Sequence, residues 1–101
     1  MPRATLAIQV LPLRALDALA AVNAAIAVVQ ASGVRHEVGP METTLEGENA
    51  AELLDVAARA HAAPLSAGAE AVQSNIRLLE QPAGLMSTQA KVAPFRAKVA
   101  S

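Results

Sequence analysis

The feature that most restricts the fold is the repeated change of hydrophobic period along the chain. Residues 4–11 alternate apolar and polar side chains, as a half-buried strand does, and residues 16–31 repeat apolar side chains every three or four positions, as a helix does. The same two patterns then recur. The predicted elements are strands at 4–11, 34–38, 41–46 and 71–79, and helices at 16–31 and from Asn49 to about Pro64. Their order predicts the β-α-β-β-α-β arrangement of ferredoxin-like domains.

Short signals mark the ends of these elements. Pro12 cannot donate to a β ladder and is expected to close the first strand. Gly33 suits the left-handed cap of the first helix. Only Gly39-Pro40 separates the second strand from the third, which predicts a tight hairpin. Asn49, with Glu52 three residues later, forms a capping pair that starts the second helix.

The expected fold class is α+β, one domain of residues 1–101 with a short helical tail at Thr88–Val92. Right-handed crossovers place both long helices on one face of a four-stranded antiparallel sheet. The side of the first helix that faces the sheet is expected to hold Leu19, Val22, Ile26 and Val29. The helix-covered face of the sheet is expected to hold Leu6, Ile8, Val10, Met41, Leu45, Val72, Ile76 and Leu78. The open face is expected to hold Gln9, Glu37, Glu42, Thr44, Glu46, Gln73, Asn75 and Arg77.

Composition argues against several functional classes. A net charge of −1 and a single aromatic residue offer neither a basic surface nor a stacking platform for nucleic acid. The chain has no cysteine and only two histidines, which lie in no cluster, so no metal site is expected. The mean hydropathy of +0.35 comes largely from alanine, and no apolar stretch reaches the ~20 residues that span a bilayer. We therefore expect a soluble, cytoplasmic protein without nucleic-acid or membrane partners.

The densest polar segment is HEVGPMETTLEGE, residues 36–48. It places four carboxylates, two threonines and a histidine on one predicted hairpin. Glu42 and Glu46 have the same parity, and Arg77 of the fourth strand is a candidate neighbour. Two interpretations stay open: a site for a cationic ligand that donates hydrogen bonds, or a solvated hairpin whose charges prevent aggregation.

Around this segment the sequence resembles the small thiamine-binding protein family. The likeness is carried by PLRALDALAAVNAAIAVVQASGVRHEVGPMETTLEGE and AARAHAAPLSAGAEAVQSNIRL, and it covers about residues 5–99. The block at residues 32–48 is the most characteristic. The resemblance implies a ferredoxin-like domain that assembles into a homodimer or homotetramer. Some members bind thiamine or its pyrimidine part, so it also implies thiamine or hydroxymethylpyrimidine as a ligand, not as a catalytic cofactor.

The resemblance carries over onto particular residues, which are His36, Pro40, Met41, Thr43, Glu46 and Gly47. Pro40 and Gly47 are expected to be structural, as a hairpin corner and as a strand exit with unusual φ. His36 has the parity of the core and is either a core histidine or a ring beside the ligand. Thr43 has core parity and Thr44 open-face parity, but a bulge would exchange them. Both threonines are therefore candidates.

The chemistry of thiamine matches the polar hairpin. Its aminopyrimidine has an amine donor and ring-nitrogen acceptors, and its thiazolium is cationic. Glu46, with Glu42 or Glu37, is expected to accept from the amine or to balance the positive charge. An aromatic wall, with cation–π attraction of about 0.5–2 kcal/mol per ring, is largely absent, since Phe95 of the tail is the sole aromatic. The expected ligand-binding residues are Gln9, His36, Glu37, Thr43, Thr44, Glu46, Asn75 and Arg77.

Two other functional classes stay open. One is a structural or regulatory oligomer without a small ligand, which would have an apolar interface. The other is a tautomerase in which removal of Met1 exposes the Pro2 amine as a general base. No arginine-rich substrate pocket and no nucleophile or phosphate motif accompanies Pro2. We therefore expect a binding protein without catalytic residues, and His61 is expected to be a hydrogen-bonding residue on a helix.

Overall fold

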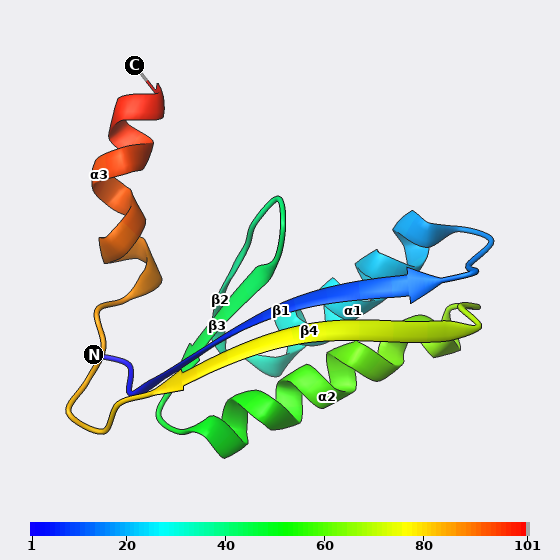
Figure 1. Cartoon of the computed structure of the whole chain (residues 1–101), viewed down its shortest axis with the longest axis horizontal. Helices are drawn as coiled ribbons and strands as arrows, with labels where there is room; N and C mark the ends of the chain where they lie inside the picture. Colours follow the sequence, from blue (N-terminus) through cyan, green and yellow to red (C-terminus); the bar gives the residue numbers. More distant parts are fainter. Residues whose placement is uncertain (101) are drawn as a thin grey trace.

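The computed structural model describes residues 1–100, with side chains as far as Arg96 in the last helix. The elements are β1 (Ala4–Leu13), α1 (Ala18–Ser32), β2 (Arg35–Val38), β3 (Thr43–Gly47), α2 (Ala50–Ser66), β4 (Ala71–Glu80) and α3 (Thr88–Ala100). The strands form one antiparallel sheet in the order β2-β3-β1-β4. α1 and α2 lie side by side on one face of it, whereas α3 stands apart from this layer (Figure 1). The predicted α+β, ferredoxin-like class is confirmed.

The sheet is longer than predicted because β1 does not stop at Pro12. Pro12 pairs with Val72 and the strand continues to Leu13. Beyond Ile8, β1 no longer pairs with β3 and is bordered only by β4. This segment is therefore an edge, where a strand tolerates a residue that lacks an N–H donor.

The first helix is confirmed, but the predicted stripe was partly wrong. α1 buries Ala21, Ala25 and Val29, which follow each other at intervals of four. Leu19 is 71% exposed. The small alanines occupy the line of closest approach to α2 and the sheet. The larger Val22 and Ile26 are half-buried at its side, because a helix can approach more closely over a methyl group than over a branched side chain.

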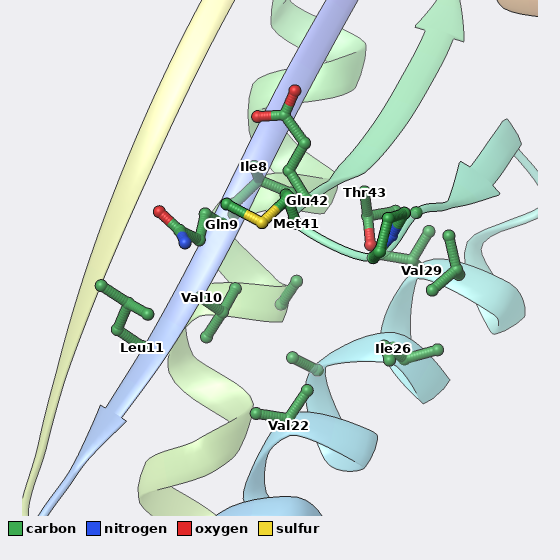
Figure 2. A pocket seen from close by; sticks show the side chains of 15 residues that line it. Ile8, Gln9, Val10, Leu11, Val22, Ile26, Val29, Met41, Glu42 and Thr43 are labelled. Atoms are coloured by element: carbon green, nitrogen blue, oxygen red, sulfur yellow. The ribbon is translucent and has the colours of Figure 1, made fainter.

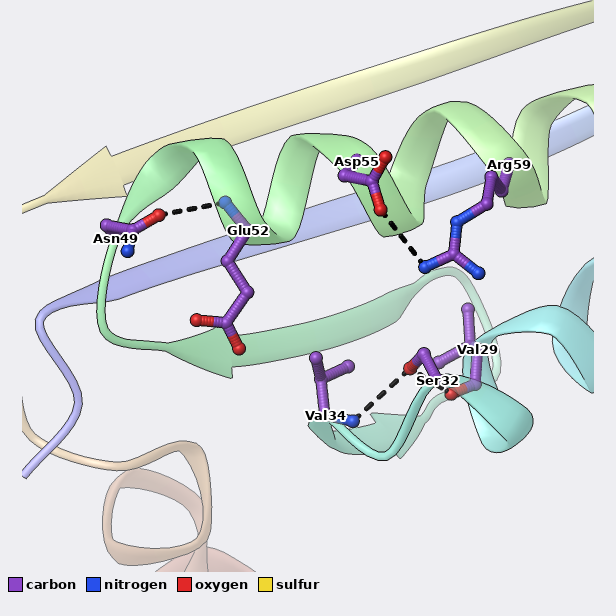
Figure 3. A network of polar contacts seen from close by, with 7 residues as sticks. All are labelled: Val29, Ser32, Val34, Asn49, Glu52, Asp55 and Arg59. Carbon is purple, nitrogen blue, oxygen red and sulfur yellow. Dashed lines mark hydrogen bonds and ion pairs between the residues drawn. The ribbon is translucent and has the colours of Figure 1, made fainter.

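Capping interactions fix the helix ends as predicted. The Asn49 side chain accepts a hydrogen bond from the Glu52 amide at 2.9 Å and starts α2 (Figure 3). Gly33, with φ of 80°, ends α1 in the left-handed conformation, and Ser32 bridges the Val29 carbonyl and the Val34 amide (Figure 3). α2 continues through Pro64 to Ser66, slightly beyond its predicted end.

The core lies between the helices and the sheet. Its fully buried centre contains Ala4 and Leu6 of β1, Leu45 of β3, and Leu53 and Ala57 of α2. The predicted helix-covered face is confirmed by register, since Leu6 faces Leu45 on one side and Leu78 on the other. On the edge strand β4, however, Ile76 and Leu78 stay about two-fifths exposed.

The hairpin differs from the prediction at its tip. β3 begins at Thr43, so Met41 and Glu42 belong to a four-residue loop closed by the Gly39 amide on the Glu42 carbonyl at 2.9 Å. Met41 is 74% exposed, and its placement in the core was wrong. A two-residue Gly-Pro turn lacks the positive φ angles that tight hairpins favour, which explains the longer loop.

Gly47 and the tail also differ from expectation. Gly47 has no positive φ. A Cβ there would lie 3.0 Å from the Leu53 side chain, so close approach of α2 explains the glycine. The tail helix α3 extends well beyond the predicted Thr88–Val92 and includes Pro94. Within the described residues, no helix is long and apolar enough to cross a membrane.

Candidate ligand-binding site on the open sheet face

The open face of the sheet consists of cross-strand rows. Paired residues in an antiparallel sheet project to the same side, so the register defines each row. The first row is Arg35, Glu46, Thr5 and Leu79. The second row is Glu37, Thr44, Ala7 and Arg77. The third row is Gln9 and Asn75. The small, half-buried Thr44 and Ala7 therefore lie between an acidic end and a basic end.

Glu46 is the buried charge of this face. It is only 6% exposed, although it lies on the side of the sheet away from α1 and α2. One carboxylate oxygen, Oε1, accepts a hydrogen bond from the Thr88 amide at the start of α3. The other, Oε2, is buried without a hydrogen-bond partner and lies 4.0 Å from Arg35 Nη1. A buried carboxylate oxygen without a donor is costly, and a ligand N–H reaches this oxygen only when the groups that cover it move aside.

The start of α3 covers the acidic end of the face. Thr88 and Gln89 line a small hollow with Arg35, Glu37 and Glu46, and Arg96 forms an ion pair with Glu37. Arg35, Gln89 and Arg96 were missed by the sequence analysis. The alternation of β2 gives Arg35 the parity of Glu37, and this was an available signal. Nothing in the sequence pattern connected the tail to the hairpin.

A second polar group lies at the other end of the face. Arg77 forms an ion pair with Glu42, which confirms the neighbour suggested by the sequence. The Asn75 amide donates to Gln9 Oε1 at 3.1 Å. These four residues and Met41 line a shallow hollow. The predicted residues on the open face thus form two groups, separated by Thr44 and Ala7.

Two predicted site residues lie on the opposite side of the sheet. His36 pairs with the buried Leu45, and its Nδ1 contacts the Val34 carbonyl at 2.9 Å, as expected of a histidine with core parity. Thr43 pairs with Ile8, and no bulge exchanges it with Thr44. Thr43 instead lines an apolar cavity of about 230 Å³ between α1, β1 and the hairpin loop (Figure 2). His36 nevertheless also lines the small hollow with Glu37 and Glu46, and Thr43 shares its cavity with Gln9 and Glu42.

The remaining candidates take other positions. His61 of α2 contacts Ser74 Oγ through Nδ1 at 2.6 Å, which confirms a hydrogen-bonding residue on a helix. The Pro2 carbonyl accepts from the Leu85 amide at 2.7 Å, and Pro2 borders a hollow with Arg35, Glu46 and Glu48. Among residues whose side chains are described, no group of three or more His, Asp or Glu is arranged to hold a metal ion.

Fold and site together define a small α+β domain with a polar, partly charged open sheet face. The model of the thiamine-binding protein family matches residues 6–96, so the chain belongs to that family. No curated protein matches the chain.

Solved structures share the fold over almost the whole chain. A domain of unknown function from Bacillus cereus is 43% identical, with a TM-score of 0.83 over 94% of this chain and 91% of that chain. A candidate thiamine biosynthesis/salvage protein from Thermotoga maritima is 27% identical, with a TM-score of 0.76 over 94% and 100% of the respective chains. A Streptococcus pneumoniae protein is 28% identical, with a TM-score of 0.69 over 95% and 99%.

Proposed function

We propose that this protein binds thiamine or a related aminopyrimidine at the open sheet face and releases it unchanged. The observation that carries the proposal is the buried Glu46 carboxylate, whose Oε2 has no hydrogen-bond partner. The exocyclic amine of an aminopyrimidine is a neutral donor of the kind this oxygen lacks. Membership of the thiamine-binding family and the likeness to the Thermotoga maritima protein support this ligand class.

The shape of the face suits a flat ring. Neighbouring strands lie about 4.8 Å apart, so the row from Glu37 to Arg77 spans roughly 14 Å between its outer backbones. Thr44 and Ala7 form a low floor within it. A pyrimidine lying on this floor would have Glu46 at one edge, and the Gln9 and Asn75 amides toward the other. The Thr44 hydroxyl is positioned to satisfy a ring nitrogen.

The charges of the face are balanced. Glu37, Glu42 and Glu46 border the face, and each is paired with an arginine: Arg96, Arg77 and Arg35 respectively. A thiazolium cation is attracted to the carboxylates, and a pyrophosphate to the arginines. The expectation that thiamine and hydroxymethylpyrimidine bind more tightly than thiamine pyrophosphate therefore stays a prediction from the carboxylate-rich hairpin.

Assembly forms part of the same proposal. Beyond Gln9, the open face carries Leu11 and Leu13 of β1, and in the row of Glu46 it carries Leu79 of β4. Leu13 is 42% exposed and Leu79 is 50% exposed. Apolar residues at both ends of a polar face favour a homodimer or homotetramer in which open faces meet. The expected non-enzymatic role and cytoplasmic location stay predictions from the sequence.

Calorimetric titration with thiamine, hydroxymethylpyrimidine and thiamine pyrophosphate tests the proposal. Glu46→Gln removes the charge but keeps an oxygen that can accept from Thr88, so the fold and the α3 contact should survive. The matched control is Glu48→Gln, two residues along the chain, where the side chain is exposed and only loosely paired with Arg3. Saturable thiamine binding that Glu46→Gln weakens by roughly tenfold or more and Glu48→Gln leaves unchanged supports the site.

Other outcomes contradict it. Equal affinity in the Glu46→Gln and wild-type proteins would move the site elsewhere. No heat with any of the three compounds, in protein shown to be folded by circular dichroism, would overturn the proposed ligand. Mass spectrometry of thiamine recovered after long incubation checks the absence of turnover, since a changed mass would indicate an enzyme.

A further inference from the structure

Strand β4 forms one border of the sheet, and its outer edge has no partner among the described strands (Figure 1). The Gln81 amide donates to the Arg3 carbonyl at 2.8 Å, which marks these two residues as a hydrogen-bonded pair. Hydrogen-bonded and non-hydrogen-bonded pairs alternate along an antiparallel ladder, so the odd-numbered residues of β4 bond to β1. The even-numbered residues direct their N–H and C=O groups outward; they are Val72, Ser74, Ile76, Leu78 and Glu80.

This edge has none of the features that usually prevent strands from pairing between molecules. Proteins protect their edges with short strands, proline, lysine or charges that point inward. β4 is ten residues long and contains neither proline nor lysine. Its Arg77 lies on the open face, and the Glu80 carboxylate at its end accepts from the Ala50 amide at 2.7 Å. The β4 edge is therefore a template for another strand.

An apolar strip follows the same border on the helix-covered side. His61 of α2 contacts Ser74 of β4, so the line of α2 residues that contains His61 faces this edge. With about 100° of turn per residue, Leu54 and Leu65 belong to that line. Together with β4 they form a strip of apolar side chains that are each 41% to 50% exposed, namely Leu54, Leu65, Ile76 and Leu78.

The side chains along β4 fit a second copy of the same strand. A twofold axis perpendicular to the sheet at Asn75 places each β4 residue opposite the one equally far along the other copy. Val72 of one copy then lies opposite Leu78 of the other, and Arg77 lies opposite the uncharged Gln73. The outward backbone groups are in register for hydrogen bonds, because even-numbered residues face even-numbered ones. An axis at Arg77 would instead place two arginines opposite each other.

Helix α2 independently supports an axis at Asn75. α2 runs opposite to β4, and His61 lies level with Ser74. One strand residue rises ~3.4 Å and one helix residue ~1.5 Å, so Asn75 is level with about residue 59 of α2. This level is midway between Leu54 and Leu65. The axis therefore brings Leu54 of one copy to the level of Leu65 of the other, and the exposed leucines of both copies line the junction.

We propose that two copies join through antiparallel pairing of their β4 edges about Asn75, which makes one continuous sheet with the α1–α2 layers of both copies on the same side. This interface is separate from contact between open faces, and it needs no ligand. Its consequence for binding rests on the proposed function. The hollow lined by Gln9, Asn75 and Arg77 lies beside the junction, so the second copy adds its Gln73 to that hollow.

Two neighbouring lysine substitutions separate this interface from contact between open faces. Leu79→Lys places a charge on the open face and should leave a dimer joined through β4. Adding Leu78→Lys places a charge inside the junction, and we expect it to raise the dissociation constant of that dimer roughly hundredfold or more. Sedimentation equilibrium over a dilution series measures both, with circular dichroism as the check of folding. A Leu79→Lys protein that is monomeric at every concentration, or a dimer that Leu78→Lys leaves intact, would overturn the proposal.

Cysteine cross-linking tests the register without changing the core. The chain has no cysteine, so each introduced thiol is unique. Asn75→Cys places two thiols on the axis in a non-hydrogen-bonded pair, with Cα atoms ~4.5 Å apart, which a disulfide spans. Gln73→Cys and Arg77→Cys should cross-link only when mixed, because in either variant alone the two thiols are four strand residues apart, or ~14 Å.

We expect oxidation to give a disulfide-linked dimer for Asn75→Cys and a heterodimer for the mixture, both identified by intact mass. A mixture that forms no heterodimer, or equal cross-linking in either variant alone, would overturn the proposed pairing. These readouts need no ligand. Failure of thiamine binding with cross-linking retained would overturn only the proposed function.

Discussion

The two faces of the sheet use neighbouring residues of the same strand in different ways. On β3, Leu45 is fully buried beneath α1 and α2, and the next residue, Glu46, is almost as buried on the opposite face. Leu45 is surrounded by apolar side chains, while Glu46 keeps an unpartnered oxygen. Burial by itself therefore does not separate structure from function. The hydrogen bonds of the buried group are more informative, because buried polar atoms are nearly always hydrogen-bonded and Glu46 Oε2 is not.

The largest effect is expected on the helix-covered face. Leu45→Ala should lower the free energy of unfolding by about 2–5 kcal/mol, because it leaves a cavity in the centre of the core. Urea denaturation followed by circular dichroism measures the change. Thr44→Ala, one residue earlier on the open face, is the matched control and should change stability by less than about 0.5 kcal/mol. Similar losses for both variants would show that the open face is packed as tightly as the core.

Two substitutions of Glu46 should distinguish its role in ligand binding from its role in anchoring α3. Glu46→Gln is expected to weaken thiamine binding by roughly 10- to 100-fold, since a hydrogen bond to a charged group contributes about 1.5–3 kcal/mol. Glu46→Ala should do the same and also release α3, because the Thr88 amide loses its acceptor. Trypsin cleavage after Lys91 and Arg96 measures that release.

Comparing the two Glu46 variants tests the anchoring of α3, because glutamine keeps an oxygen that can accept from the Thr88 amide and alanine does not. Faster cleavage in Glu46→Ala than in Glu46→Gln would confirm that an oxygen at this position anchors the helix. Equal cleavage in both and in wild type would show that α3 is held by other contacts. The helix would then not depend on the acidic end of the open face.

The sequence allowed most of the fold to be predicted, because the main elements depend on local pattern. Alternation placed Leu6 and Leu45 on the same face, and the Asn49 cap starts α2 as expected. The errors occurred where tertiary packing overrides local pattern. Leu19 fits the apolar period of α1, but the close approach of helix and sheet selects the alanines Ala21 and Ala25.

The site was less predictable than the fold. Parity placed Thr44, Glu46 and Arg77 on the open face, and the register confirms this placement. Parity could not show that Glu46 is buried, since its cover comes from residue 88, which lies 42 positions further along the chain. Contacts at such sequence distance leave no periodic signal. Whether these residues bind the ligand stays a prediction.

A smaller effect is expected at the start of α2. Asn49→Ala should lower the free energy of unfolding by about 1 kcal/mol, because the Glu52 amide loses its capping acceptor. Asn49→Ser keeps a capping oxygen and should stay close to wild type. Thiamine affinity should not change in either variant, since this cap lies on the helix-covered side. A change in affinity would show that the two faces are coupled through β3 and Gly47.

The smallest effect is expected for the ion pair between Arg77 and Glu42. Arg77 is exposed and Glu42 partly so, and exposed pairs of this kind contribute about 0.2–1 kcal/mol. A double-mutant cycle with Arg77→Gln and Glu42→Gln should give a coupling energy in that range, which falls as salt is added. Thiamine affinity should fall less in Arg77→Gln than in Glu46→Gln. An equal or larger loss of affinity in Arg77→Gln would place the ligand at the Gln9–Asn75 end of the face instead of beside Glu46. The reason is that the exposed ion pair between Arg77 and Glu42 affects binding strongly only where the ligand excludes water from it.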